Sequence, residues 1–532
     1  MAFLPFLDAD AAHTRFQYLE DLSTGYWFSE VLFASVELKL FDLIEGEFPD
    51  TVTLAGMTRT ESDGLNTLLY ALERMALVKE IEGKWVNSQC ARTYLLSAGE
   101  FYLGNFLLYR KYMQANWRGL VWKISGKSEQ KDISEEGDDY KTRTFNYVRA
   151  MDELARIKAI EIVDMVNPGA WHPPILDIGG GAGSLCRGFL RQEENRNNKE
   201  SASDVYADLL ELPEVIEASR RIYPDNRFWQ DIRTIKGDFR QDSFCPEKKY
   251  GLIILGNFLH AYSADEAKIY LEKALTLLDP NGLILIHDYF PDRRGESPQK
   301  GPLYDLNMML NTYNGRCHQS GEVRSWMENS GIKTCLVRDL KTDSSVIAGS
   351  KQEKPFFEIF RGGEGERLGE WVYHARDEGF RDARLLPVDK IVTGSWVRKK
   401  CENGCRLYGK NLKCPPKGMH VSATEKMLQS YSYALVIEGE PPGKTFYRKL
   451  RSLERKAFLN GFHKVFVFGA GHCPVCEACS VEEGCRYPEK ARPSMEGSGI
   501  DVYETAKNAG IRLAPVTEKN QYVKYIGLLL LE

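Results

Sequence analysis

Apolar residues in the first hundred positions recur at the spacing of an α-helix, which predicts amphipathic helices. The first apolar stripe consists of Phe28, Leu32, Val36, Leu40 and Ile44. A second stripe occupies residues 65–75, and after it apolar and polar residues alternate around Glu82-Gly83, as expected for a short hairpin. Helices followed by a hairpin predict a winged helix within residues 1–110.

From Pro173 onward, short apolar runs alternate with amphipathic segments, the pattern of a doubly wound α/β sheet. The clearest strand candidates are residues 175–178, 250–257 and 282–290. Between the last two, Ser263 and Glu266 have the spacing of a helix capping box. We therefore expect an α/β domain at residues 166–350, joined to the winged helix by connecting helices at residues 111–165.

A chain of 532 residues is too long for one hydrophobic core, so several domains are expected. The polar segment at residues 350–354 is a candidate linker to a C-terminal α+β domain at residues 355–532. The hydrophobic fraction of 43% and the charged fraction of 27% are typical of folded, water-soluble proteins.

The charge balance argues against nucleic acid as a partner. The net charge is -5, and the helix of the winged helix that would enter a DNA groove has one Arg and one Glu. Dimerisation through helices is the stronger expectation. The sequence has neither a secretory signal nor about 20 consecutive apolar residues, so we expect a cytoplasmic protein without a membrane partner.

A nucleotide-type ligand site is predicted where the α/β region begins. The strand at residues 175–178 contains Asp177 and is followed by a glycine-rich turn that includes Gly179 and Gly181. Glycines there let the backbone approach a ligand closely. Glu211 ends the next expected strand, where a carboxylate can accept hydrogen bonds from two ribose hydroxyls.

Three further residues follow later strands of the same region. Asp238 is a candidate partner of an adenine amino group, and Phe239 is a candidate for the face of its ring. Asn257 follows the fourth expected strand. Because the carboxyl ends of parallel strands meet at one edge of a sheet, these residues are expected to lie together.

The motifs D-I-G-G-G-A-G-S, E-L-P-E-V-I, K-G-D-F and N-F-L-H-A-Y-S resemble those of the plant-type and acetylserotonin-type O-methyltransferases, over residues 20–350. The resemblance implies a Rossmann-like class I methyltransferase domain, S-adenosylmethionine as cofactor, and a homodimer formed by the winged-helix domain. It also implies a small-molecule methyl acceptor, which from the sequence can be aromatic, tetrapyrrole-like or a thiol.

The resemblance gives His260 the role of the base that deprotonates the acceptor. An imidazole suits proton transfer near neutral pH. The family commonly has an Asp after this His, whereas here the residue is Ala261. His260 can also be only a hydrogen-bonded residue at a strand end, and His287 and Asp288 are secondary candidates for the catalytic role.

Seven of the twelve cysteines cluster near the C-terminus, which favours metal binding over disulfides in a chain without a secretory signal. They are Cys401, Cys405, Cys414, Cys473, Cys476, Cys479 and Cys485. The C-x-x-C-x-x-C spacing of the second group is similar to that of ferredoxins, and an iron–sulfur cluster, most readily [4Fe–4S], is expected. Zinc is the alternative, and one or two metal centres fit the spacing.

The C-terminal domain also resembles an uncharacterised family of predicted metal-binding proteins, through C-E-N-G-C, K-C-P-P and C-R-Y-P-E-K-A-R-P-S-M-E. We therefore expect a methyltransferase whose iron–sulfur domain supplies electrons from a donor, binds substrate or senses redox state. One alternative is an enzyme in which the cluster performs the main chemistry. Another is a redox- or metal-sensing regulator that uses the winged helix.

Overall fold

The computed structural model describes residues 16–126, 138–196, 205–241, 248–293, 301–354, 356–361, 368–369, 371–513 and 523–531. The chain divides into two compact units, Met1–Arg361 and Gly362–Glu532. The candidate linker at residues 350–354 belongs to the first unit, a few residues before this division. Pro355, where the C-terminal domain was expected to begin, lies outside the described residues.

The N-terminal part of the first unit contains the expected helices and hairpin. Its elements are α1 (Phe16–Thr24), α2 (Tyr26–Glu37), α3 (Leu40–Glu47), α4 (Thr51–Thr58), α5 (Ser62–Arg74), β1 (Val78–Ile81), β2 (Lys84–Asn87) and α6 (Gln89–Tyr94). The hairpin turns at Glu82-Gly83, where both φ angles are positive. The first apolar stripe is split between α2 and α3, because Lys39 adopts a left-handed conformation with φ of 53°.

Three helices follow the winged helix: α7 (Gly104–Trp117), α8 (Leu120–Ile124) and α9 (Asp138–Met165). Helix α7 packs against both α2 and α9 and so connects the winged helix to the α/β part of the unit. In this part of the chain, residues 127–137 lie outside the described residues.

A seven-stranded sheet has the order β5-β4-β3-β6-β7-β9-β8. Its strands are β3 (Ile175–Ile178), β4 (Ala207–Glu211), β5 (Ile232–Lys236), β6 (Tyr250–Gly256), β7 (Leu278–Asp288), β8 (Thr334–Asp339) and β9 (Ser345–Ser350). Strands β5, β4, β3, β6 and β7 pair in parallel. Strand β9 pairs antiparallel with β7, and β8 pairs antiparallel with β9. Strand β7 begins at Leu278, earlier than predicted, directly after the preceding helix.

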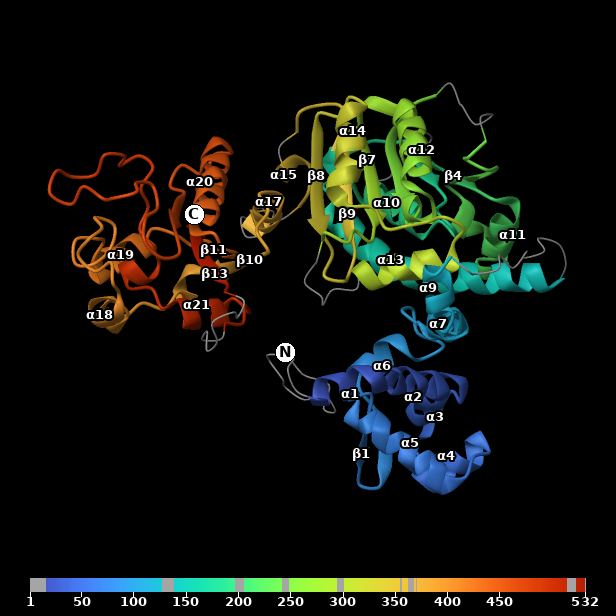
Figure 1. Ribbon diagram of the computed structural model, residues 1–532. Helices are drawn as coiled ribbons and strands as arrows, with labels where there is room; N and C mark the ends of the chain where they lie inside the picture. Colours follow the sequence, from blue (N-terminus) through green and yellow to red (C-terminus); the bar gives the residue numbers. More distant parts are fainter. Residues whose placement is uncertain are drawn as a thin grey trace. The chain divides into compact units, whose positions relative to one another are not determined.

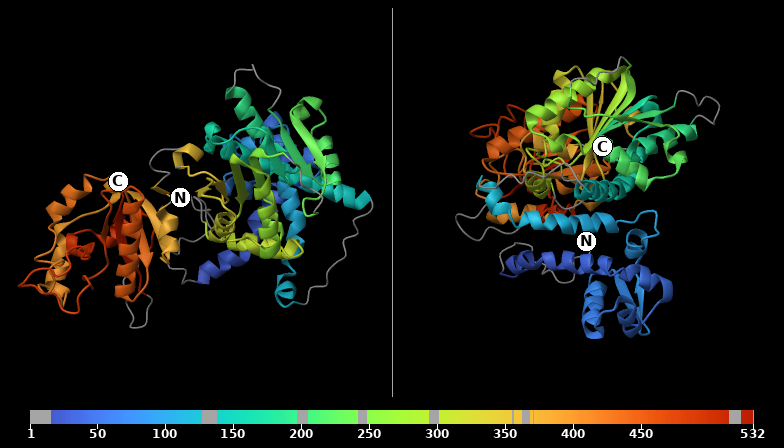
Figure 2. Two further views of the ribbon diagram at one scale, coloured as in Figure 1. Left: turned by 90° about the horizontal axis from the view of Figure 1, so that it is seen from above. Right: turned by 90° about the vertical axis from the view of Figure 1, so that its right-hand side faces the viewer.

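Helices cover both faces of this sheet (Figures 1 and 2). The helices of this part, besides α9, are α10 (Ser184–Arg196), α11 (Pro213–Ile222), α12 (Ala264–Leu277), α13 (Gly301–Asn311), α14 (Ser320–Asn329) and α15 (Phe356–Ile359). Strand side chains alternate between two cores, one shared with α9 and α10 and the other with α12 and α14. The predicted capping box of α12 is confirmed at Ser263 and Glu266.

The second unit is an α+β domain with a four-stranded antiparallel sheet in the order β10-β11-β13-β12. The strands are β10 (Asp382–Pro387), β11 (Tyr433–Gly439), β12 (Phe466–Phe468) and β13 (Tyr525–Leu530). The helices are α17 (Trp371–Asp377), α18 (Ser395–Gly404), α19 (Val421–Leu428), α20 (Gly443–Leu459) and α21 (Val502–Asn508). Helices α17 and α20 pack on one face, and α19 and α21 on the other. Within the described residues, no helix is long and apolar enough to span a bilayer.

Candidate functional site

The glycine-rich turn between β3 and α10 exposes backbone to open space. Gly179 and Gly181 have φ angles of 66° and 58°, a conformation that favours glycine. A Cβ on Gly180 would lie 2.4 Å from the carboxyl carbon of Asp177, whereas a Cβ on Gly181 would meet no atom within 4 Å. The turn is thus packed on its inner side and free at Gly181, where a ligand can approach.

Asp177 lies beneath this turn and is 1% exposed. Its Oδ2 accepts a hydrogen bond from the amide of Cys186 at 3.3 Å, and its Oδ1 has no hydrogen-bond partner among the described residues. Burial raises the pKa of Asp177 to about 6. A buried acceptor that is left unsatisfied fits a ligand that donates a hydrogen bond to it.

Glu211 ends β4 beside the turn, as the sequence predicted. Its Oε1 accepts from the amide of Gly181 at 3.0 Å, and its Oε2 accepts from the amide of Leu212 at 2.8 Å. Burial raises the pKa of Glu211 to about 7, although both amide donors oppose this shift. Each carboxylate oxygen keeps a second lone pair, so both remain able to accept from ribose hydroxyls.

Asp238 and Phe239 follow β5, but both have partners within the protein. Arg240 donates from Nε to both carboxylate oxygens of Asp238 at 2.8 Å and thereby lowers its pKa. Phe239 is 4% exposed and packs against Phe258, with 6.1 Å between ring centroids. The adenine contacts of Asp238 and Phe239 therefore stay predictions. Asn257 has a φ of 52° and donates its amide to the carbonyl of His287 at 2.8 Å.

His260 lies in a short 3₁₀ helix after β6 and pairs with Asp288 at the end of β7. The Nδ1 of His260 is 2.5 Å from Oδ1 of Asp288, and the His260 amide donates to Oδ2 at 3.2 Å. Burial acts to raise the pKa of Asp288, but His260 outweighs it and the pKa is lowered. Asp288 is therefore ionised and accepts from Nδ1–H, which leaves the lone pair of His260 on Nε2.

His287, the other secondary candidate, supports the strand end instead of acting as a base. Its Nε2 and Ser344 Oγ are 2.9 Å apart, and Lys158 Nζ donates to the same Oγ at 2.7 Å. Burial and then the charge of Lys158 lower the pKa of His287 to about 3. A neutral, buried and hydrogen-bonded imidazole holds the end of β7 in place beside Asp288.

Two stacked tyrosine rings lie next to the His260–Asp288 pair, and no pattern in the sequence predicted them. Tyr304 of α13 lies edge-on to His260 at 5.7 Å and stacks on Tyr289 at 3.7 Å. Arg110 of α7 lies over the Tyr304 ring at 5.7 Å. Only the fold brings α7 and α13 together beside His260, because the two helices are about 200 residues apart in the chain.

The thiols of the second unit lie on two segments that contact each other. Cys401 is in the last turn of α18, Cys405 is its C-cap residue and Cys414 precedes α19. The amide of Leu412 donates to Sγ of Cys479 at 3.5 Å. Asn411 Nδ2 donates to the carbonyl of Cys473 at 3.4 Å. The first and second cysteine groups of the sequence therefore adjoin.

Cys414 has thiols of both groups around it. Burial raises the pKa of Cys414 to about 11, the charges of Cys401, Cys405 and Cys473 act in the same direction, and a hydrogen bond from the Cys473 backbone opposes them. All eleven cysteines of the described residues are free. In this conformation, the described residues contain no group of three or more His, Cys, Asp or Glu side chains placed to hold one metal ion. Cys476 and Cys485 lie in the same segment as Cys473 and are half-buried.

Three family models match the chain in sequence. Residues 20–97 match the O-methyltransferase dimerisation domain, and residues 132–333 match the O-methyltransferase domain. Residues 384–531 match a family described as "Predicted metal-binding protein". The resemblances expected from the sequence motifs are thus confirmed for both parts of the chain.

Known proteins resemble the first part of the chain. A human probable bifunctional dTTP/UTP pyrophosphatase/methyltransferase protein is 24% identical over 346 residues, which are 63% of this chain and 53% of the relative, so the match spans about half of that protein. The 3-hydroxy-5-methyl-1-naphthoate 3-O-methyltransferase of Streptomyces sahachiroi is 22% identical, over 63% of this chain and 94% of the relative.

A solved structure has the same fold. Human N-acetylserotonin methyltransferase in complex with SAM superposes with a TM-score of 0.56 at 21% identity. The superposition covers 65% of this chain and all of that chain.

Proposed function

The chain carries an O-methyltransferase domain between its dimerisation domain and a predicted metal-binding domain, and we propose that it methylates a hydroxyl group of a small organic molecule. The proposed methyl donor is S-adenosylmethionine. The observation that carries this proposal is the His260–Asp288 pair next to the glycine-rich turn, because it combines a base with a ligand site on one sheet edge.

The residues around the turn fit the cofactor. Gly181 offers backbone beside open space, Glu211 can accept from both ribose hydroxyls, and Asp177 has an unsatisfied acceptor. We propose that Asn257 shapes the neighbouring backbone, and that Asp238 and Phe239 lie near the adenine. When bound, the cofactor supplies a methyl group on a sulfonium, which a nucleophile attacks.

His260 acts as the general base that deprotonates the acceptor hydroxyl. Its Nε2 lone pair accepts the proton of the acceptor hydroxyl, and Asp288 stabilises the positive charge that then forms on the ring. Asp288 also fixes the orientation of the ring, since it binds both Nδ1 and the His260 amide. Ala261 replaces the Asp that the family commonly has at this position, and the carboxylate comes from the next strand instead.

We propose a flat aromatic alcohol as the acceptor. The Tyr304 ring lies beside His260 and stacks on Tyr289, and such rings favour contact with planar ligands. Two of the proteins similar to this chain are named for N-acetylserotonin and for a hydroxylated naphthoate. Tetrapyrrole-like molecules and thiols are the alternative acceptors.

The test is methyl transfer from labelled S-adenosylmethionine to a panel of phenols, thiols and tetrapyrroles. We expect transfer to a phenol and a large loss of that transfer in H260Q. Methylation of thiols alone, at equal rates in the two proteins, would overturn the proposal, because a thiol that ionises near neutral pH does not need this base.

We further propose that the seven C-terminal cysteines bind an iron–sulfur cluster, with zinc as the alternative. The support is the donor set: free thiols from two adjoining segments, the chemistry that both kinds of centre require. Anaerobic purification with iron, zinc and sulfide analysis distinguishes the two. Iron with matching sulfide supports the cluster and a role in electron transfer, redox sensing or substrate activation. Zinc alone would overturn it.

The chain is proposed to act as a homodimer in a reducing compartment such as the cytoplasm. Helix α1 has no buried residue, and its Leu19 and Leu22 are 63% and 62% exposed. Exposed apolar side chains in a row are typical of a surface that a partner covers. The free state of all eleven described cysteines fits a reducing compartment.

A further inference from the structure

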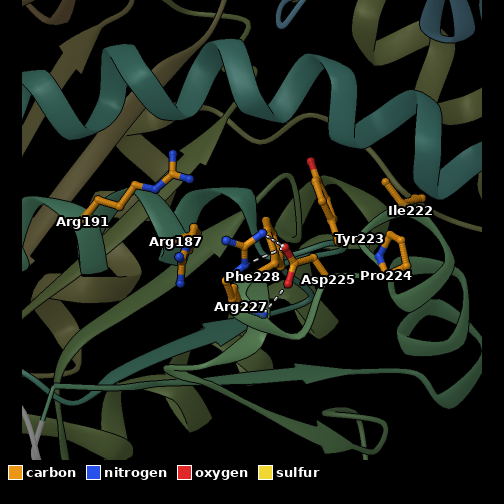
Figure 3. Close-up of a pocket in the computed structure, with 8 residues that line it drawn as sticks. All are labelled: Arg187, Arg191, Ile222, Tyr223, Pro224, Asp225, Arg227 and Phe228. Atoms are coloured by element: carbon orange, nitrogen blue, oxygen red, sulfur yellow. Dashed lines mark hydrogen bonds and ion pairs between the residues drawn. The ribbon is translucent and has the colours of Figure 1, made fainter.

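A cavity of about 380 Å³ lies in the α/β part of the first unit, and none of its lining residues belongs to the proposed methyl-transfer site. Figure 3 shows Arg187 and Arg191 of α10 on one side of it and the segment between α11 and β5 on the other. That segment contributes Tyr223, Pro224, Asp225, Arg227 and Phe228, and Ile222 is the last residue of α11. Three arginines and a single carboxylate therefore line this cavity.

Only one of the three arginines is neutralised in the described structure. Arg227 Nη2 lies 2.7 Å from Oδ2 of Asp225. The Nε and Nη1 of Arg187 are buried and have no hydrogen-bond partner among the described residues. An unpaired buried guanidinium nitrogen is costly, because it has lost water without gaining an acceptor.

Arg191 adds a second uncompensated charge. It is exposed, lies one helical turn after Arg187, and makes no ion pair with another described residue. Two like charges at positions i and i+4 of a helix repel each other. A bound anion would remove this repulsion.

The stacked rings of Tyr223 and Phe228 form one wall of the cavity and contact Arg187. Phe228 stacks on Tyr223 with 3.9 Å between centroids, and the Arg187 guanidinium lies 5.7 Å from the Phe228 centroid. The Tyr223 hydroxyl donates to buried Asp152 at 2.6 Å. The ring stacking and the hydrogen bond to Asp152 hold Tyr223 and Phe228 in position. The cavity is therefore lined by packed aromatic side chains as well as by arginines.

We propose that this cavity binds the phosphate group of a small phosphorylated molecule. Guanidinium groups bind phosphate oxygens through paired hydrogen bonds, and two uncompensated arginines match its double charge. S-adenosylmethionine contains no phosphate, so the ligand is a molecule other than the proposed cofactor. The net charge of -5 disfavours a nucleic acid strand and favours a small ligand.

The test is calorimetric titration of the full-length protein with inorganic phosphate, pyrophosphate and ADP. Saturating S-adenosylhomocysteine keeps these probes out of the cofactor site. We expect saturable binding of at least one probe and at least about tenfold weaker binding in R187Q and in R191Q, since each removes a charged hydrogen-bond donor. Arg191 is exposed, so R191Q keeps the test valid if R187Q destabilises the fold.

R220Q is the matched control. Arg220 lies over the ring of Trp229 at 4.1 Å but does not line the cavity, so its loss should leave phosphate binding unchanged. No saturable binding of any probe would overturn the proposal, and so would an equal loss in R220Q. Acetate that binds as tightly as phosphate would also overturn it, because the site would then not distinguish phosphate from other anions. Methyl-transfer activity does not enter this test, so it is independent of the proposed function.

Discussion

The imidazole of His260 and the carboxylate of Asp288 form a buried pair at the ends of two adjacent parallel strands, with Nδ1 2.5 Å from Oδ1. Asp288 accepts from both the ring and the backbone amide of His260, so it fixes the side chain and the turn that carries it. The proton that the acceptor loses can enter only at Nε2.

The two residues are expected to act as one unit in catalysis. H260Q should lower kcat by about 10²–10⁴-fold, the usual contribution of a general base, and D288N should lower it by at least about tenfold. The double variant should be no slower than H260Q, because Asp288 acts through the ring. Steady-state kinetics measure this, with H172Q as a control at a half-exposed histidine. Additive losses would contradict the pairing.

Cofactor affinity is expected to rise with pH through about pH 7. Burial raises the pKa of Glu211 to about 7, so the free protein holds a proton there below that pH. The ionised carboxylate accepts from both ribose hydroxyls, whereas protonation turns one of its oxygens into a donor, so binding favours release of this proton. Below pH 7 the affinity should rise by up to about tenfold per pH unit and then level off. Calorimetric titration with S-adenosylhomocysteine at several pH values tests this. The same dependence of affinity on pH in E211Q would contradict it.

Gly181→Asp is expected to abolish cofactor binding without changing the bound metal. The substitution puts a side chain into the open space at the turn, at a positive φ and beside the carboxylate of Glu211. Gly331→Asp is the matched control, because Gly331 has a φ of 90° and equally open space before β8. Calorimetry and metal analysis give the two readouts. If folded Gly181→Asp protein lost both cofactor binding and bound metal, the cofactor site and the metal site would not be separate.

Replacement of one thiol in either cysteine segment is expected to lower the metal content. C414S and C473S should each reduce bound metal several-fold, because each removes a thiolate ligand. C90S should leave it unchanged, since Cys90 is an exposed cysteine of the first unit. Metal per chain after anaerobic purification is the measurement. If C414S and C473S both kept the full metal content, Cys414 and Cys473 would be excluded as ligands.

Leu22→Glu is expected to convert the dimer to a monomer. The substitution puts a charge among the exposed apolar residues of α1, where a partner subunit would have to bury it. Ile269→Glu is the control, because Ile269 is 59% exposed on α12 of the α/β part. Light scattering after size exclusion reports the mass. A dimer that survives in L22E would place the interface elsewhere.

The sequence alone identified the features that depend on near neighbours. The hairpin at Glu82-Gly83, the capping box of Ser263 and Glu266, and the position of Glu211 at the end of its strand were all predicted. Turn conformation, helix capping and strand length are set by interactions between residues a few positions apart, so they can be read from local patterns.

Contacts between distant residues were decided by the tertiary structure. The sequence named His260 and Asp288 as separate candidates for the catalytic role, and only the structure shows that the Asp288 carboxylate binds the His260 ring. Asp238 has the position expected of an adenine contact and yet pairs with Arg240. Side-chain pairing across elements depends on packing and burial of the whole domain, and no local pattern encodes those. The sequence thus determined which residues can do chemistry, and the fold decided which of them meet.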